Sequence, residues 1–322
     1  MRTILTHIFF LLFFWAQSQI QSTIIATSSE IDLIPEGIAV HPRTGKMYVS
    51  SIARHKILMV DSSGKCKDFI RSGEHGFLEG LGMKVDSKRN LLWALSNKKD
   101  GKWFISQVHG FDLSSSKMKH FYSIKDTIPH LFNDLDIDQQ GNIYLTDMHY
   151  CAVYFLDARK RKLELFLRNT LTMYPNGIAL GTNNQLFIAT YQNGIVNIDL
   201  KKKISGKLSG IKDSIKSHGI DGLVFTNNSL IGVYNYNIYD STGFAIPAVI
   251  KYSLDERGCV IKEELLDEAN KHFVEPTTLS VLGNKLFVLA NSHLAAYNAN
   301  KQSTKGIEKQ LKPITILQYR LH

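Results

Sequence analysis

The sequence predicts an all-β fold, a six-bladed β-propeller with four-stranded antiparallel blades. Three observations support this prediction. Runs rich in β-branched and aromatic residues alternate with turn residues, helical periodicity is scarce, and one strand–turn–strand unit recurs six times. A repeat of roughly 40–50 residues built from short strands is the pattern of propeller blades. A β-sandwich or a pair of barrels would not require six matching repeats.

Each repeat has a short polar lead, a β-rich run, a turn and a second β-rich run. Further runs follow each pair, for example residues 56–60 and 66–70, which gives four strands per blade. Alignment on the second run places six residues at one equivalent position: Glu36, Leu81, Asn133, Asn176, Asp221 and Glu275. In the second repeat, Glu79-Gly80-Leu81-Gly82 starts two residues earlier than the other leads.

The remaining segments complete the predicted architecture. The run 314–319 is the candidate strand that closes the last blade, and residues 23–27 could supply its other half. Short helices are expected within 263–272 and 210–218, between repeats. No change in composition marks a linker, so residues 23–322 are interpreted as a single propeller domain and a monomer is expected.

The N-terminus is typical of an export signal. Arg2 precedes the apolar run 8–15, which is followed by Ala16-Gln17-Ser18. A charged start, a short apolar core and small residues at a cleavage site define a signal peptide, here residues 1–22 with cleavage near Ser18 or Ser22. The run is short for a membrane span. The protein is therefore expected to be exported, secreted or periplasmic, with no membrane anchor after cleavage.

Charge and cysteine content exclude some classes of function. The net charge is +9, but the basic residues stand in short bursts between apolar runs, at expected turns, with no aromatic–basic stripe for stacking bases. Nucleic acid is therefore not an expected partner. The three cysteines, Cys66, Cys151 and Cys259, are an odd number, and the fold does not depend on a disulfide framework.

The equivalent position of the repeats predicts a metal site. In a propeller the innermost strand of each blade follows the central tunnel, so equivalent residues point toward one axis. Five of the six carry a side-chain oxygen: Glu36, Asn133, Asn176, Asp221 and Glu275. Carboxylate and amide oxygens without sulfur or imidazole suit a hard cation. The expected cofactor is one divalent cation, Ca²⁺ first, with Mg²⁺, Mn²⁺ or Zn²⁺ as alternatives. Polar residues before strands are also common simply because turns favour them.

The motifs at four of these positions carry a resemblance to a known family. They are Pro-Glu-Gly-Ile-Ala at Glu36, Phe-Asn-Asp at Asn133, Pro-Asn-Gly-Ile-Ala at Asn176 and Ile-Asp-Gly-Leu at Asp221. In this order they resemble the metal-site motifs of the senescence-marker-protein (regucalcin), gluconolactonase and LRE-like family, and more distantly the paraoxonase and strictosidine-synthase-like propellers. The resemblance implies a six-bladed propeller that hydrolyses a lactone or other ester. It also implies that Asp221 is both a metal ligand and the catalytic group that activates water or attacks the substrate.

The chain departs from the sugar-lactone members of that family. They carry an Arg two residues before the Asn of Phe-Asn-Asp, where this chain has Leu131, and their acidic substrate contact after the third blade's second strand is missing. A less polar pocket is expected for a small-molecule substrate. Its candidate substrate-binding residues are His130, His149, Tyr191, Tyr236 and Glu275.

Two alternatives remain open. A non-catalytic propeller of the NHL or YWTD type would bind a protein, peptide or glycan on one face, and would have no reason to converge Glu, Asn, Asn and Asp on one point. A related propeller could also keep the metal only as a structural element. The sequence contains no Gly-x-Ser-x-Gly, His-Glu-x-x-His or Cys-x-x-Cys motif.

Overall fold

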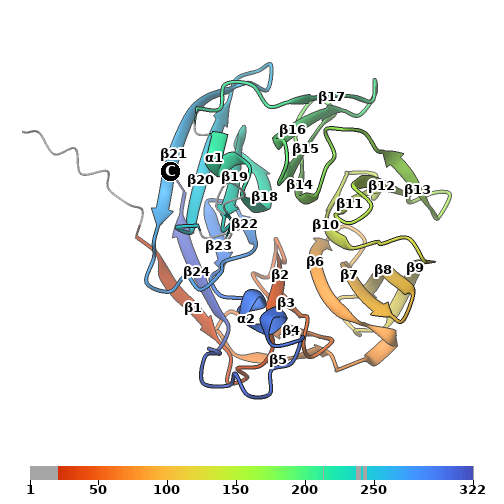
Figure 1. The fold of residues 1–322 in the computed structure, drawn as a ribbon, viewed down its shortest axis with the longest axis vertical. Coiled ribbons are helices and arrows are strands. Elements are labelled where there is room, and N and C mark those ends of the chain that lie inside the picture. Colours follow the sequence, from red (N-terminus) through yellow and green to blue (C-terminus); the bar gives the residue numbers. More distant parts are fainter. Residues whose placement is uncertain (1–20, 213, 237–240, 242–244, 322) are drawn as a thin grey trace, which may run out of the picture.

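A computed structural model describes residues 21–212, 214–236, 241 and 245–321. Six four-stranded antiparallel sheets stand around a central axis (Figure 1). The predicted fold class is therefore confirmed. The predicted signal peptide falls almost entirely on residues 1–20, outside the described residues. Within the described part of the chain, no helix has the length and apolar character needed to cross a membrane.

Five blades follow one another along the chain, each starting at its inner strand. Blade 1 has β2 (Pro35–Val40), β3 (Met47–Ser51), β4 (Lys56–Val60) and β5 (Cys66–Ile70). Blade 2 has β6 (Glu79–Asp86), β7 (Leu91–Asp100), β8 (Trp103–Asp112) and β9 (Met118–Asp126). Blade 3 has β10 (Phe132–Ile137), β11 (Ile143–Asp147), β12 (Ala152–Asp157) and β13 (Lys162–Leu167). Blade 4 has β14 (Pro175–Leu180), β15 (Gln185–Thr190), β16 (Gly194–Asp199) and β17 (Ile204–Lys207). Blade 5 has β18 (Ile220–Thr226), β19 (Ser229–Tyr234), β20 (Ala248–Leu254) and β21 (Val260–Glu268).

Blade 6 is built from both ends of the described chain. Its strands are β22 (Leu279–Leu282), β23 (Lys285–Leu289), β24 (Thr315–Arg320) and β1 (Thr23–Thr27). Strands β1 and β24 pair antiparallel, with Thr23 opposite Gln318. They lie side by side at the outer edge of this blade (Figure 1). Both predicted closing strands are confirmed.

Helices are few and short. The 3₁₀ turn Glu74–Gly76 and the helices α1 (Ser214–Ser217) and α2 (Leu294–Ala299) all lie between strands. Helix α1 covers part of the predicted helix within 210–218. The helix predicted within 263–272 is wrong, because residues up to Glu268 continue β21, which pairs with β20. The Glu- and Leu-rich composition of this segment favours a helix locally, but completing the sheet of blade 5 overrides that preference.

The core is a ring of apolar clusters, one between each pair of neighbouring blades. The cluster between blades 1 and 2, for example, includes Tyr48, Ile57, Phe77 and Phe111. Corresponding clusters follow around the ring to the one between blades 6 and 1. Each blade buries both faces, so the sheets are held face to face by side-chain packing rather than by backbone pairing.

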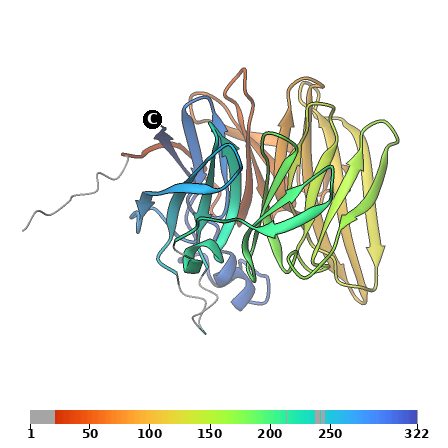
Figure 2. The same ribbon diagram turned by 90° about the horizontal axis from the view of Figure 1, so that it is seen from above.

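A seventh cluster lies at one end of the ring. The segment 293–311, here called the cap segment, connects β23 to β24 and begins with α2. Its Tyr297, Ile307 and Leu311 pack on Ile34 and Ile52 of blade 1 and on Leu81 of blade 2, with Leu131 of blade 3 at the margin. Seen from the side, α2 stands beyond one end of the strands (Figure 2).

The three cysteines, all within the described residues, are free. The basic residues 159–161 and 201–203 lie at turns as predicted, whereas Lys162 begins β13 and Lys98 and Lys99 are on β7 near its exposed end. None of these groups faces the central axis from an inner strand.

One buried histidine is a core residue with an unusual environment. His109 on β8 is 0 % exposed, and its Nε2 contacts Gln107 Oε1 (3.1 Å) and Ser96 Oγ (3.0 Å). Its Nδ1 has no hydrogen-bond partner among the described residues, and the ring stacks on Phe111. The amide oxygen of Gln107 can only accept, so the proton belongs on Nε2. Burial lowers the pKa of His109 to about 4, and the charge of His75 acts in the same direction.

This environment predicts a loss of stability in mild acid. His109 is neutral in the folded protein, whereas in the unfolded chain it takes up a proton near pH 6.5. Stability is therefore lost as the pH falls from 6.5 toward 4, by about 2 kcal/mol between pH 7.5 and 5. Urea unfolding at both pH values should show this loss in the wild type. In His109→Phe the loss of stability should be smaller by about 2 kcal/mol. Equal losses in the two proteins would contradict the assignment of His109 as neutral in the folded state.

Candidate functional site

The inner strands share an irregularity that turns one residue of each toward the axis. In five blades the pairing of the first two strands shifts at the same place, between Pro35 and Ile38, Gly80 and Met83, Phe132 and Leu135, Pro175 and Ile178, and Ile220 and Leu223. A bulge of this kind bends the strand and re-aims the side chain it carries. The re-aimed residues are Glu36, Leu81, Asn133, Asn176 and Asp221.

These five residues line one cavity of about 510 Å³, here called the tunnel cavity. The predicted quartet Glu36, Asn133, Asn176 and Asp221 also lines a much smaller cavity of about 10 Å³, together with Gly82, Asp134, Gly222 and Thr278. The quartet therefore lies between the two cavities. The end of the larger cavity at the quartet is here called its floor. The structure brings together the four side chains that the sequence placed at one register.

The sixth position was predicted wrongly. In blade 6, Leu279 lies opposite Val288, as Ile38 lies opposite Val49 in blade 1, so the residue equivalent to Glu36 is Thr277 and not Glu275. The prolines show the same register, because Pro35, Pro175 and Pro276 each follow a residue with positive φ, namely Ile34 (48°), Tyr174 (51°) and Glu275 (60°). Alignment of these prolines would have found Thr277 from the sequence.

Glu275 still lines the tunnel cavity, but its carboxylate has another partner. Both of its oxygens accept from the backbone N–H of Ala295, at 3.1 and 2.9 Å, near the N-terminus of α2. Thr277 instead donates from Oγ1 to the carbonyl oxygen of Glu36 (3.0 Å). Glu275 therefore holds the cap segment, and Thr277 holds the first residue of the quartet.

The two carboxylates of the quartet are buried close to each other. Burial, and then the charges of Asp221 and Glu275, raise the pKa of Glu36 well above its usual value, while the hydroxyl of Ser292 donates to its Oε2 (3.1 Å). Burial also raises the pKa of Asp221 to about 7, against the lowering effect of hydrogen bonds from Asn235 and Asn176. Asn235 donates from Nδ2 to Asp221 Oδ2 at 2.6 Å. Buried like charges of this kind are stabilised by a nearby cation.

The two amides have their nitrogen atoms engaged. Asn176 donates from Nδ2 to the hydroxyl of Tyr191 (3.0 Å), and Asn133 Nδ2 contacts the sulfur of Met148 (3.6 Å). The described residues contain no metal-binding group of three or more His, Cys, Asp or Glu side chains. The quartet holds only two such residues, and amide oxygens supply the rest of its donors. Two carboxylates and two amides converging on one cavity fit a hard divalent cation that keeps positions open for water.

The predicted substrate-binding residues divide into two groups. His149, Tyr191 and Tyr236 line the tunnel cavity, as does Leu131. His130 does not, because its ring is 5 % exposed and lies against Asp147 and Tyr150. Sequence reasoning missed other lining residues, including Asn97 on β7, Asn235 after β19, and Leu294, Asn298 and Gln302 of the cap segment. No motif marks these positions in the sequence.

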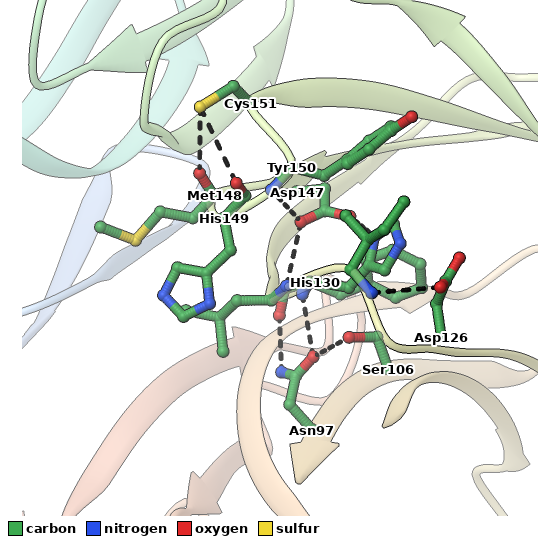
Figure 3. A network of polar contacts seen from close by, with 12 residues as sticks. Asn97, Ser106, Asp126, His130, Asp147, Met148, His149, Tyr150 and Cys151 are labelled. Carbon is green, nitrogen blue, oxygen red and sulfur yellow. Dashed lines mark hydrogen bonds and ion pairs between the residues drawn. The ribbon is translucent and has the colours of Figure 1, made fainter. Parts of the chain in front are cut away.

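His130 belongs to a buried group of hydrogen-bonded side chains, Asn97, His130 and Asp147, here called the latch (Figure 3). The latch positions the strand that carries Asn133. Asp147, 0 % exposed, contacts His130 Nδ1 at 2.5 Å through Oδ2, and its Oδ1 accepts from the N–H groups of Leu131 (2.9 Å) and Tyr150 (3.0 Å). Asn97 bridges from blade 2, donating to the carbonyl of Phe132 and accepting from its N–H, both at 2.9 Å.

Figure 3 also shows the two residues that follow Asp147 along the chain. Met148 and His149 follow Asp147 directly, and both line the tunnel cavity. Burial lowers the pKa of His149, so its ring is neutral at pH 7. One buried carboxylate thus positions one member of the quartet and two residues of the cavity wall.

Comparison with solved structures places the fold among known propellers. A gluconolactonase from Xanthomonas campestris is 12% identical with a TM-score of 0.61, covering 95% of this chain and 91% of its own. The calcium-binding protein regucalcin from Agrobacterium tumefaciens is 14% identical with a TM-score of 0.59, covering 94% and 96%. A virginiamycin B lyase from Staphylococcus aureus, with quinupristin, is 15% identical with a TM-score of 0.61, covering 94% and 100%. At these identities the likeness concerns the fold alone.

No curated protein matches the chain by sequence. A family model does match, the SMP-30/gluconolactonase/LRE-like region, over residues 34–233. This range contains the whole quartet and the latch, and it covers more than half of the chain. The chain therefore belongs to the SMP-30/gluconolactonase/LRE-like family.

Proposed function

We propose that the chain is an exported, metal-dependent hydrolase of a lactone or other ester. The observation that carries the proposal is the convergence of Glu36, Asn133, Asn176 and Asp221 at the floor of one open cavity. Membership of a family that includes gluconolactonases supports the reaction type. A substrate less polar than a sugar lactone is supported by Ile52, Leu81, Leu131 and Met148, which line the cavity beside the polar side chains of Glu79, Asn97, Asn298 and Gln302.

A divalent cation held by the quartet would polarise the carbonyl of the bound substrate and lower the pKa of a water molecule. It would also keep Asp221 ionised at neutral pH, because a nearby positive charge favours the anion. Asn235 fixes the orientation of that carboxylate through Oδ2. Asp221 would then take a proton as the water oxygen bonds to the carbonyl carbon. The same proton would pass to the leaving oxygen as the ester C–O bond breaks.

Ser292 and Tyr191 support the site from its two sides. Ser292 donates to Glu36, and Tyr191 accepts from Asn176. Burial raises the pKa of Tyr191 well above its usual value, with the nearby carboxylates adding to the effect, so its hydroxyl stays neutral and can orient the amide at working pH. Both hydroxyl groups act on the orientation of quartet members.

The hydrolase proposal predicts activity that depends on the quartet. Purified protein should turn over members of a lactone and aryl-ester panel with Ca²⁺, Mg²⁺, Mn²⁺ or Zn²⁺. Asp221→Ala and Asn133→Ala should lower kcat/KM at least about 100-fold, because each removes a group placed at the reacting atoms. Glu256→Ala, at the exposed turn between β20 and β21, is the control. Equal activity in all four proteins would sink the proposed site, and folded, metal-free, inactive protein would favour a binding propeller.

The same geometry predicts which carboxylates bind the ion. Elemental analysis should find about one divalent ion per folded chain, and Ca²⁺ at 100 times its Kd should stabilise the protein by about 2.7 kcal/mol. Asp221→Ala should lose this stabilisation. Glu275→Gln should keep it, because Glu275 lies off the register and holds α2. Loss of the ion in Glu275→Gln would show that the blade 6 register argument is wrong.

The latch should affect ion binding without touching the ion. Asp147→Asn removes one of two acceptor oxygens in a fully buried group, and should cost about 3 kcal/mol of stability. It should also weaken ion binding by about tenfold or more, as loss of an outer partner does in other metal sites. Asp157→Asn, which changes a carboxylate at the end of β12 in the same blade, should leave the ion affinity unchanged. An unchanged affinity in Asp147→Asn would limit the latch to a role in stability.

A further inference from the structure

The tunnel cavity continues into a second depression on one side of its mouth. Met148, Tyr191 and Tyr236 line both. The second depression has a volume of about 550 Å³, and its other lining residues are Tyr174 and Gln192. These five residues are here called the tyrosine groove. Because the two spaces share three side chains, a molecule whose one end lies over the quartet can place its other end in the groove.

Among the described residues, the lining of the groove is mostly apolar and carries no charged side chain. Three tyrosine rings and a methionine make most of this surface, and Gln192 adds an amide. Tyr174 is 46 % exposed and Tyr236 is 43 % exposed. The rings of Tyr191 and Tyr236 lie 5.4 Å apart between centroids, inclined by 58°. Exposed aromatic faces gathered beside a cavity mark a binding surface.

The groove lies where the cap segment leaves the ring open. Tyr174 in blade 4 is the equivalent of Ile34 in blade 1, since each precedes the first proline of its inner strand and has a positive φ. Ile34 is 0 % exposed because the cap segment packs on it. Blades 1 and 4 stand on opposite sides of the ring (Figure 1). Among the described residues, the cap segment therefore covers this end of the ring over blade 1 but does not cover Tyr174 of blade 4.

Contacts with the quartet and with the backbone hold the residues of the tyrosine groove in place. The hydroxyl of Tyr191 accepts from Asn176, and the backbone N–H of Tyr191 donates to the carbonyl of Tyr174 (3.2 Å). Met148 contacts Asn133 through its sulfur. Two groove residues therefore touch two members of the quartet, so the position of the groove relative to the floor of the cavity is fixed.

We propose that the tyrosine groove is the subsite for an extended apolar substituent, an alkyl chain or an aromatic ring, of the substrate whose carbonyl lies over the quartet. This inference rests on the proposed function for the identity of the reacting end. It commits the substrate class to lactones or esters with a hydrophobic arm. Tyrosine faces and a thioether bind such arms through apolar contact and ring stacking.

The test uses binding, so that it does not depend on turnover. The probes are a five-membered lactam carrying a hexyl chain, the same ring carrying a phenyl group, and the unsubstituted lactam. Calorimetric titration of the full chain with Ca²⁺ present should show at least about tenfold tighter binding of a substituted ring. In the double variant Tyr174→Asn/Tyr236→Ser the gain should fall below threefold. Asn suits the positive φ at position 174.

Two controls separate the groove from general effects. Phe121→Ser removes an aromatic ring that is 45 % exposed on β9 of blade 2, away from the groove, and should keep the tenfold gain. Tyr236→Phe should keep it too, because the ring face and not the hydroxyl makes the contact. The hexyl and phenyl probes decide which kind of arm the groove prefers.

The result that overturns the proposal is an equal affinity for substituted and unsubstituted rings in the wild type, or no binding of any of them. A gain that survives in the double variant would overturn it as well. Failure of the hydrolase proposal is separate. A protein that turns over no lactone or ester, but still binds the substituted rings through Tyr174 and Tyr236, would have the subsite without the reaction.

Discussion

Hydrogen bonds from hydroxyl groups of one blade to the inner strand of the next set the geometry on which the site depends. Ser50 Oγ donates to the carbonyl of Leu81 (2.7 Å), Thr146 Oγ1 to that of Asn176 (2.7 Å) and Thr277 Oγ1 to that of Glu36 (3.0 Å). In each case a hydroxyl on one blade holds the bulged residue of the next. A bulge leaves backbone groups without ladder partners, and buried groups of this kind are costly unless they are bonded elsewhere. The same bonds that satisfy the bulge also fix the direction of its side chain.

The backbones of neighbouring blades pack closely around the axis, and this restricts the groups that form these hydrogen bonds. A methyl group at Gly177 would lie 2.4 Å from the carbonyl oxygen of Asp221, and one at Gly37 would lie 2.2 Å from that of Leu81. The glycine after Glu36 and the glycine after Asn176 are therefore needed for the approach of the next strand, and not for a turn. Where the sequence motif pairs a quartet residue with a glycine, the first carries the side-chain oxygen and the glycine allows the next blade to come near.

The sequence was sufficient for the architecture and for the quartet, because both repeat along the chain. Alternating strands and turns fix the blades, and four matched motifs fix Glu36, Asn133, Asn176 and Asp221. Blade 6 was harder, because Glu275 resembles a ligand by type while Pro276 sets the register that places Thr277 on the axis.

Side chains that depend on long-range packing gave no local signal. His130 was expected at the rim, but Asp147 draws it into the interior. The cap segment could not be placed, since its contacts with Ile34 and Leu81 cross most of the chain.

The closure of blade 6 has a consequence for how the molecule folds. Strand β24 joins β23 to β1, so the ring is complete only when residues near Thr23 meet residues near Gln318. Blades 1 to 5 are each made of consecutive strands and can form from local contacts, whereas this pairing has a very large sequence separation and is slow by its topology. Glu36 is on β2, the strand that follows β1. Thr277 and Ser292, which both donate hydrogen bonds to Glu36, belong to blade 6. Glu36 therefore gains these two contacts only when blade 6 meets blade 1, whereas Asn133 and Asn176 are held by contacts within blades 3 and 4.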